Sequence, residues 1–260
     1  MEGKKMEFQQ TSKDKENHGA SIPGVQQPTS VVFEVLPHHR QILDNLRKYE
    51  MKYRPKPCFM LMQKEINHKD RSKVINWMVK ICKKYNLNTE TLHLAVGYLD
   101  RYLTLQVKEV KKSSLRLVGG TALYIASKYQ QNVDSFSFLT EDNYTKKQVL
   151  DMENIMLHTL SHNLFTPTSC CFINAYLVLF EMPNKLKYLA MYISELSLVK
   201  GNIFMGILPS LVASASIALA RHLLGMDMWT PELQEITTYK LNVFKRVIRK
   251  LSIIHKSAKS

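Results

Sequence analysis

Apolar side chains recur every three or four residues through most of the chain after residue 38, and the alternation typical of β-strands is nearly absent. The first helices that this periodicity predicts span about 71–85, 89–106, 112–130 and 145–162, with a shorter turn around 138–143. A second group is predicted over about 168–182, 184–199, 206–224, 231–237 and 241–256. The pattern therefore predicts an all-α fold.

The two groups of helices follow the same order of lengths, and Thr166-Pro167-Thr168 breaks the chain between them. In each group the third helix carries small residues among its apolar ones, which lets neighbouring helices approach it closely on several sides. These small residues are Gly119, Gly120, Ala122 and Ala126 in the first group, and Ala213, Ser214, Ala215, Ala218 and Ala220 in the second. We therefore expect two tandem five-helix bundles, each wrapped about its third helix.

Ahead of the first bundle the sequence predicts a tail and a separate N-terminal helix. Residues 1–35 are polar with few large apolar side chains, a composition typical of disordered segments. Ile42, Leu46 and Tyr49 form a short apolar stripe, and the prolines within 54–57 break the chain after it. We divide the chain into a tail at 1–35, a helix and linker at 36–57, and bundles at 58–164 and 165–260.

The composition is that of a strongly basic globular protein. Apolar residues make up 45% of the 260 positions, and 36 Lys and Arg against 22 Asp and Glu give a net charge of +14. This charge predicts attraction to acidic proteins, nucleic acid or anionic surfaces without choosing among them. The N-terminal residues include no apolar signal segment, so we expect an intracellular protein. The uncharged stretch 201–220 contains Pro209 and several serines, which favours a buried core helix over a membrane span.

The chain has no clear catalytic or metal-binding motif. No CxxC pair and no histidine at a zinc spacing accompanies its cysteines, so we interpret them as small core residues: Cys58, Cys82, Cys170 and Cys171. A phosphate-binding glycine loop, HExxH and GxSxG are all missing. His158 and His162 share a helix face, which by itself indicates structural or surface histidines. We therefore expect a non-catalytic protein without cofactor or metal.

Three long segments resemble a known family. They are DRSKVINWMVKICKKYNLNTETLHLAVGYLDRYL, LRLVGGTALYIASKY and TEDNYTKKQVLDMENIMLHTLSHNL. Together they resemble the cyclin box, closest to the A-type and B-type mitotic cyclins, and the likeness continues through SELSL and LPSLVASASIALA in the second half. This resemblance implies two tandem cyclin-box bundles and a regulatory subunit of a cyclin-dependent kinase in cell-cycle control.

Five positions that mark the cyclin box are matched: Arg71, Asp100, Leu117, Lys128 and Glu153. Arg71 opens one predicted helix and Asp100 lies near the end of the next, so a two-point ion pair between them would clamp the two helices. The resemblance implies that Lys128 and Glu153 face the kinase beside its mobile αC helix.

By the same resemblance, the kinase interface also includes three apolar or aromatic residues: Tyr129, Leu117 and Ile42. A cyclin favours the active kinase by binding that arrangement more tightly than the inactive one. Near this interface the sequence departs from the A-type pattern, because Gln130 and Gln131 stand where two glutamates are usual. The sequence therefore predicts docking on a kinase more strongly than it predicts activation of that kinase.

Mitotic cyclins also carry a groove that accepts Arg-x-Leu peptides, and this chain alters it. The corresponding positions are Asp70, Lys73, Val74, Trp77, Lys80, Leu115 and Arg116. Asp70 and Lys73 replace apolar residues of the family motif, Lys80 replaces an acidic one, and Arg116 replaces a glutamine. Charges where a leucine side chain should sit add a desolvation penalty, and a basic rim repels the peptide's arginine. The sequence therefore predicts poor binding of Arg-x-Leu substrates.

The tail contains Lys15-Glu16-Asn17, which resembles a KEN degron. In a polar tail ahead of a cyclin box, this tripeptide predicts recognition by a ubiquitin ligase of the anaphase-promoting type.

The alternative is a cyclin-fold transcription adaptor that binds nucleic acid, or a kinase-independent scaffold. Its phosphate contacts would come from basic clusters at Lys83-Lys84, at Lys108 with Lys111-Lys112, and at Lys245, Arg246, Arg249 and Lys250. On amphipathic helices such clusters are more often solvated faces, so we expect neither a nucleic-acid partner nor membrane association. The cluster at 245–250 also suits nuclear import, and we expect a nuclear and cytoplasmic protein with the nucleus favoured.

Overall fold

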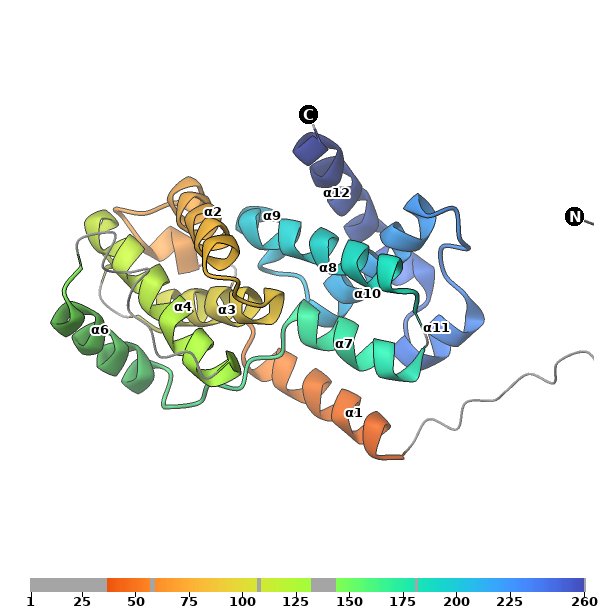
Figure 1. The fold of residues 1–260 in the computed structure, drawn as a ribbon, viewed down its shortest axis with the longest axis horizontal. Helices are drawn as coiled ribbons and strands as arrows, with labels where there is room; N and C mark the ends of the chain where they lie inside the picture. Colours follow the sequence, from red (N-terminus) through yellow and green to blue (C-terminus); the bar gives the residue numbers. More distant parts are fainter. Residues whose placement is uncertain (1–36, 57–58, 107–108, 132–143, 181, 260) are drawn as a thin grey trace, which may run out of the picture. The chain divides into compact units, whose positions relative to one another are not determined.

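The computed structural model describes residues 37–56, 59–106, 109–131, 144–180 and 182–259, which form helices and connecting loops without a β-strand among them (Figure 1). The first bundle contains α2 (His68–Lys84), α3 (Thr89–Leu105), α4 (Leu115–Gln131) and α6 (Lys146–Thr159), with short 3-10 turns η1 (Phe59–Met62) and η2 (Lys112–Ser114). The second contains α7 (Ser169–Leu179), α8 (Asn184–Val199), α9 (Gly201–Phe204), α10 (Pro209–Leu223), α11 (Pro231–Thr237) and α12 (Leu241–Lys259). The all-α prediction is confirmed.

The predicted helix positions are close to those observed. The ranges predicted at 184–199 and 231–237 coincide with α8 and α11. The helix predicted at 206–224 corresponds to α10, which begins at Pro209 because a proline at the first helical position lacks only an N–H that is not needed there. The short helix α9 was not predicted. The turn predicted around 138–143 lies outside the described residues, so the first bundle is described by four helices.

Local capping explains where two helices of the first bundle begin. The Asn67 side chain accepts from the backbone of Asp70, whose carboxylate accepts from the Asn67 backbone N–H, and this capping box starts α2 at His68. Thr145 and Gln148 form the same reciprocal arrangement at the start of α6. These caps satisfy N–H groups that a helix leaves unpaired in its first turn.

Each bundle surrounds one nearly fully buried helix. In the first bundle α4 is buried continuously from Val118 to Ser127, and it packs against α2, α3 and α6. A Cβ on Gly119 would lie only 2.4 Å from Cγ1 of Val74, so α2 needs the glycine in order to pack this closely. In the second bundle α10 takes the same place among α7, α8 and α12.

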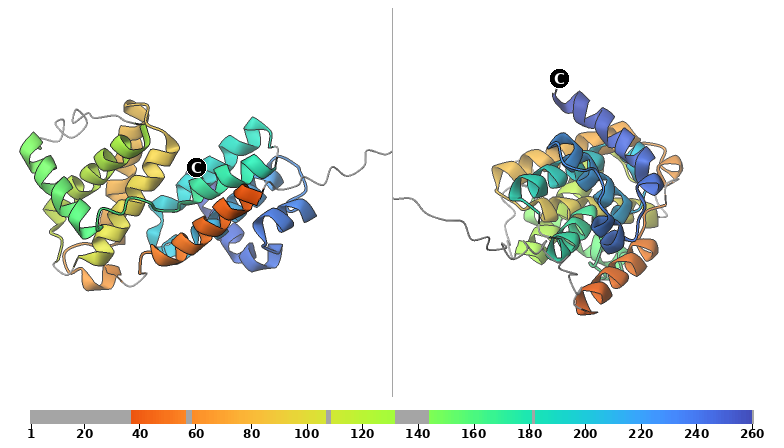
Figure 2. Two further views of the ribbon diagram at one scale, coloured as in Figure 1. Left: turned by 90° about the horizontal axis from the view of Figure 1, so that it is seen from below. Right: turned by 90° about the vertical axis from the view of Figure 1, so that its right-hand side faces the viewer.

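Helix α1 (Pro37–Lys52) precedes the first bundle in sequence and packs on the second one, along α7 (Figures 1 and 2). Leu43 and Leu46 are buried in the core of the second bundle. At the other end of α1, the Glu50 carboxylate accepts a 2.9 Å hydrogen bond from the backbone N–H of Ser210 and a 2.7 Å bond from its hydroxyl. A carboxylate at this place stabilises the N-terminus of α10. The predicted N-terminal helix is thus tied to the second bundle.

Among the described residues, no helix combines the length and apolar character that crossing a bilayer requires. The same residues contain no cluster of three or more His, Cys, Asp or Glu side chains arranged to hold a metal ion.

Candidate functional site

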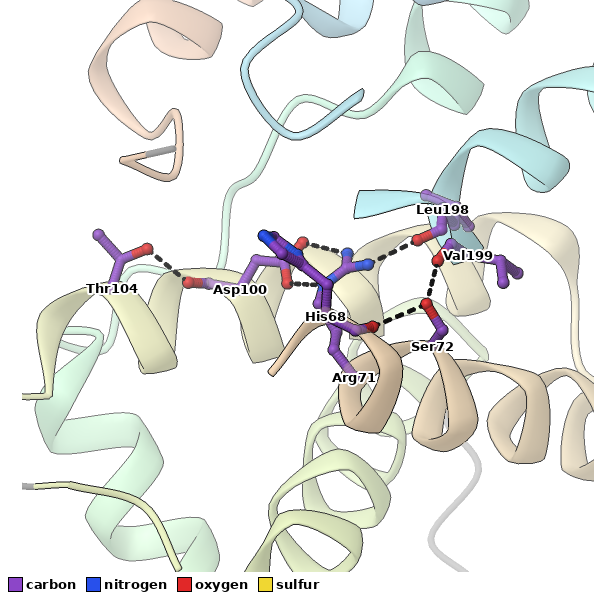
Figure 3. A network of polar contacts seen from close by, with 7 residues as sticks. All are labelled: His68, Arg71, Ser72, Asp100, Thr104, Leu198 and Val199. Atoms are coloured by element: carbon purple, nitrogen blue, oxygen red, sulfur yellow. Dashed lines mark hydrogen bonds and ion pairs between the residues drawn. The ribbon is translucent and has the colours of Figure 1, made fainter. Parts of the chain in front are cut away.

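Arg71 on α2 and Asp100 on α3 form a two-point ion pair (Figure 3). The Arg71 Nε donates to Asp100 Oδ1 at 2.7 Å, and a terminal nitrogen donates to Oδ2 at 2.6 Å. Both side chains are almost fully buried, at 3% and 8% exposed. The two residues that the sequence suggested as a clamp therefore lie in direct contact.

The same arginine reaches the second bundle. Its remaining terminal nitrogen donates to the carbonyl of Leu198 at 2.8 Å, and the neighbouring Ser72 hydroxyl donates to the carbonyl of Val199 at 2.7 Å (Figure 3). A Cβ on Gly201 would lie 2.4 Å from the Arg71 guanidinium, so a glycine is needed here. Arg71 thus joins α2, α3 and the end of α8, a wider role than the sequence indicated.

Lys128 and Glu153 lie together on adjacent helices of the first bundle. The Lys128 Nζ is 3.0 Å from Glu153 Oε1, and it also lies 4.8 Å from the centre of the Tyr124 ring. The lysine side chain is 40% exposed and the glutamate side chain 10%. Tyr129, the next residue on α4, is half exposed. These residues therefore present a small charged and aromatic surface where α4 ends.

The other two residues assigned to this interface lie elsewhere. Leu117 is near the start of α4, about 16 Å along the helix axis from Lys128, and packs partly buried against the core of the first bundle. Ile42 is half exposed on α1, which packs on the second bundle. The structure brings Lys128, Glu153 and Tyr129 to one end of the first bundle, and it places Leu117 and Ile42 apart from them.

The altered groove positions divide into buried and exposed groups. Asp70 is buried beneath Lys112, whose Nζ lies 2.9 Å away, and this hydrogen bond holds the pKa of Asp70 below its ordinary value. Val74 and Leu115 are also buried. Trp77 is partly buried, and the Arg116 guanidinium lies 4.8 Å from its ring centre. Lys73 and Lys80 are exposed on α2. The tryptophan face is therefore occupied by an arginine of the same chain.

His93 is a buried group that the sequence reasoning missed. Its ring nitrogens lie 3.3 Å from the Ser169 hydroxyl and 3.4 Å from the Ser194 hydroxyl, at the junction of α3, α7 and α8. Burial lowers the pKa of His93 to about 3, so the ring is neutral at physiological pH. No local motif marks it, because both partners are far away in sequence.

The remaining candidates are the cysteines, the histidine pair and the KEN tripeptide. Cys82 and Cys170 are buried thiols, and burial raises the pKa of Cys82 to about 12, which keeps it unreactive. The rings of His158 and His162 contact each other edge to face at 5.0 Å. Cys58 and the KEN tripeptide, Lys15-Glu16-Asn17, lie outside the described residues.

Comparison with known families covers nearly all of the helical region. Residues 41–165 match the N-terminal domain of cyclins, and residues 167–260 match the C-terminal domain. The chain belongs to the cyclin family. Both helical bundles are therefore cyclin domains, and the Arg71–Asp100 pair lies in the first of them.

Similar proteins include several A-type cyclins. The chain is 53% identical to "G2/mitotic-specific cyclin-A" of Drosophila melanogaster over 230 residues, which are 87% of this cyclin and 46% of the relative. It is 37% identical to mouse "Cyclin-A1" over 235 residues, 89% of this cyclin and 55% of the relative. This cyclin thus spans about half the length of the curated relatives it matches. A viral cyclin from herpesvirus saimiri shares the fold, with a TM-score of 0.73 and 21% identity, covering 82% of this cyclin and 96% of the viral chain.

Proposed function

We propose that this cyclin is a non-catalytic regulatory subunit that binds and activates a cyclin-dependent serine/threonine kinase during cell division, in the G2 or mitotic phase. The names of its relatives, G2/mitotic-specific cyclin-A among them, support this assignment. The likeness to a subunit of the yeast RNA polymerase II CTD kinase complex, with a TM-score of 0.55 and 16% identity, concerns the fold alone.

The observation that carries the proposal is the pairing of Lys128 with Glu153 at the end of the first bundle. The lysine can donate to backbone carbonyls of a kinase, and the glutamate can accept from its backbone N–H groups. A partly exposed ion pair is worth only about 0–1 kcal/mol, so exchanging it for contacts with the kinase costs little. The two side chains are held close together before binding, which reduces the ordering cost.

Activation would follow from differential binding. A protein kinase is active when the lysine of its third strand pairs with the glutamate of its αC helix. If Lys128, Glu153 and Tyr129 contact the inward position of αC better than the outward one, binding shifts the kinase toward its active state. A cyclin that bound both positions equally would associate with the kinase without activating it.

Substrate docking would differ from that of other mitotic cyclins. The half-buried Trp77 is already covered by Arg116, and the exposed lysines at 73 and 80 add positive charge to the rim. An Arg-x-Leu peptide would have to displace one arginine and approach two further cations. We propose that such peptides are poor ligands for this cyclin.

The tail and the last helix carry the signals proposed for degradation and for location of this cyclin. The tripeptide Lys15-Glu16-Asn17 would serve as a degron for a ubiquitin ligase of the anaphase-promoting type. The basic residues at 245–250 would favour the nucleus, with a cytoplasmic fraction.

Affinity purification from dividing cells tests the proposal. We expect a cyclin-dependent kinase to co-purify with the tagged full chain and to phosphorylate a histone substrate above the level of the kinase alone. Co-purification of nucleic acid without any kinase would favour the transcription-adaptor alternative instead. A co-purified kinase without increased activity would support binding and contradict activation.

A further inference from the structure

Helix α2 presents a row of lysines along its solvent face. Lys69, Lys73, Lys80 and Lys83 follow one another at steps of four, seven and three residues, which places them on one side of a helix. All four are exposed. At 1.5 Å per residue, the row extends for about 21 Å. The four side chains therefore place positive charge along one side of the whole helix.

Few acidic side chains of the protein offset the positive charge of these lysines. None of the four lysines forms an ion pair within the described part of the chain. The acidic residue of α2, Asp70, is buried and already paired with Lys112. Burial raises the pKa of Glu195 on α8, and this effect outweighs the opposite effect of the Lys83 charge. The outer surface therefore keeps most of its positive charge.

Arg116 adds a further cation beside the row, and it also limits what can bind there. Its guanidinium lies 4.8 Å from the centre of the Trp77 ring, and Trp77 stands between Lys73 and Lys80 in the sequence of α2. Single-stranded nucleic acids gain much of their affinity by stacking bases on free aromatic faces. Because this face is occupied, electrostatic contacts to a flexible acidic chain are favoured over base stacking.

We infer that the α2 lysine row is a docking surface for an Asp- and Glu-rich peptide segment of a partner protein. An extended peptide of about six residues spans the same 21 Å. Carboxylates on such a segment can approach successive lysines, and charge complementarity accelerates association and selects against basic ligands. The same lysines that would repel the arginine of an Arg-x-Leu peptide would thus attract an acidic peptide.

Titration of the purified full chain with a fluorescent six-residue polyglutamate peptide tests this inference, without any kinase present. The site variant carries Lys73→Glu, Lys80→Glu and Lys83→Glu. The control variant carries Lys245→Glu, Lys250→Glu and Lys256→Glu, three exposed lysines of α12, and so has the same net charge. Circular dichroism spectra of both variants should match that of the parent chain. Because no kinase takes part, the result is independent of the proposed kinase binding.

We expect measurable binding at about 50 mM salt, a loss of about tenfold or more in the site variant, and little change in the control. Equal losses in both variants would show attraction to the overall charge of +14 and would overturn the inference. The absence of peptide binding would overturn it as well. Tighter binding of a DNA oligonucleotide through the same lysines would assign the surface to nucleic acid.

Discussion

Arg71 binds Asp100 at two points while a third nitrogen of the same guanidinium binds the carbonyl of Leu198, so one buried side chain holds parts of both cyclin domains. A buried ion pair contributes modestly compared with well-packed apolar residues, but an unpaired buried charge is costly. Removing one partner should therefore have a larger effect than removing both.

We expect Arg71→Ala to lower the free energy of unfolding by about 3–5 kcal/mol, because it leaves the Asp100 carboxylate buried without a partner. The double variant Arg71→Met with Asp100→Leu should be more stable than Arg71→Ala. Urea unfolding followed by circular dichroism measures both. A double variant less stable than the single one would contradict this account of the clamp.

His93 should make folding stability depend on pH. Its pKa is about 3 in the folded chain, against an ordinary value of 6.5, so between these values the unfolded chain binds a proton that the folded chain does not. The stability is therefore intact above pH 6.5 and falls as the pH decreases. From pH 7 to pH 5, this one group should cost about 2 kcal/mol.

The variant His93→Gln isolates this effect, because glutamine stays neutral throughout the range. We expect the difference in unfolding free energy between the parent chain and the variant to move by about 2 kcal/mol in favour of the variant from pH 7 to pH 5. A difference that stays constant with pH would mean that His93 takes up a proton as readily in the folded chain as in the unfolded chain.

Arg-x-Leu peptides should bind weakly. Isothermal titration of the purified chain with such a peptide should give no low-micromolar binding, because Arg116 covers Trp77 and the rim is basic. The triple variant Lys73→Ile, Lys80→Glu and Arg116→Gln should raise the affinity by about tenfold or more. Low-micromolar binding by the parent chain that disappears on Trp77→Ala would contradict the altered-groove hypothesis.

The lifetime of the protein should depend on its tail. Replacing Lys15, Glu16 and Asn17 together by alanine removes the charged and amide groups of the KEN-like tripeptide. We expect the variant to persist longer than the parent chain at mitotic exit in a cycloheximide chase. If the two half-lives agree, the tripeptide is not a degron in this protein.

Local signals in the sequence were sufficient to predict most helices. The start of α11 follows from Thr230 and Pro231, and the start of α8 follows from Pro183 before it, because cap residues and prolines act over a few positions. The helix predicted at 206–224 matches α10, whereas the four-residue helix α9 was not predicted. A single turn such as α9 is too short to show a helical periodicity of apolar residues.

Contacts between distant segments were predictable only where a family resemblance pointed to them. The resemblance singled out Arg71 and Asp100, which lie 29 residues apart. It did not single out Glu50 and Ser210, which are 160 residues apart, or His93 and Ser194, which are 101 apart. In those pairs each residue looks ordinary in its own segment. The packing of α1 on the second bundle brings Glu50 to Ser210, and the packing of the first bundle against the second brings His93 to Ser194.

Titration of a purified cyclin-dependent kinase against three forms of the chain tests the central claim most directly. The forms are the parent chain, the interface variant Lys128→Ala with Glu153→Ala, and the control variant Lys64→Ala with Glu109→Ala, which removes another ion pair of the same 3.0 Å length. We predict that the parent chain and the control bind the kinase alike, and that the interface variant loses about a hundredfold or more in affinity. Undiminished binding by the interface variant would contradict the proposed interface, and absence of binding by the parent chain would contradict the proposed function.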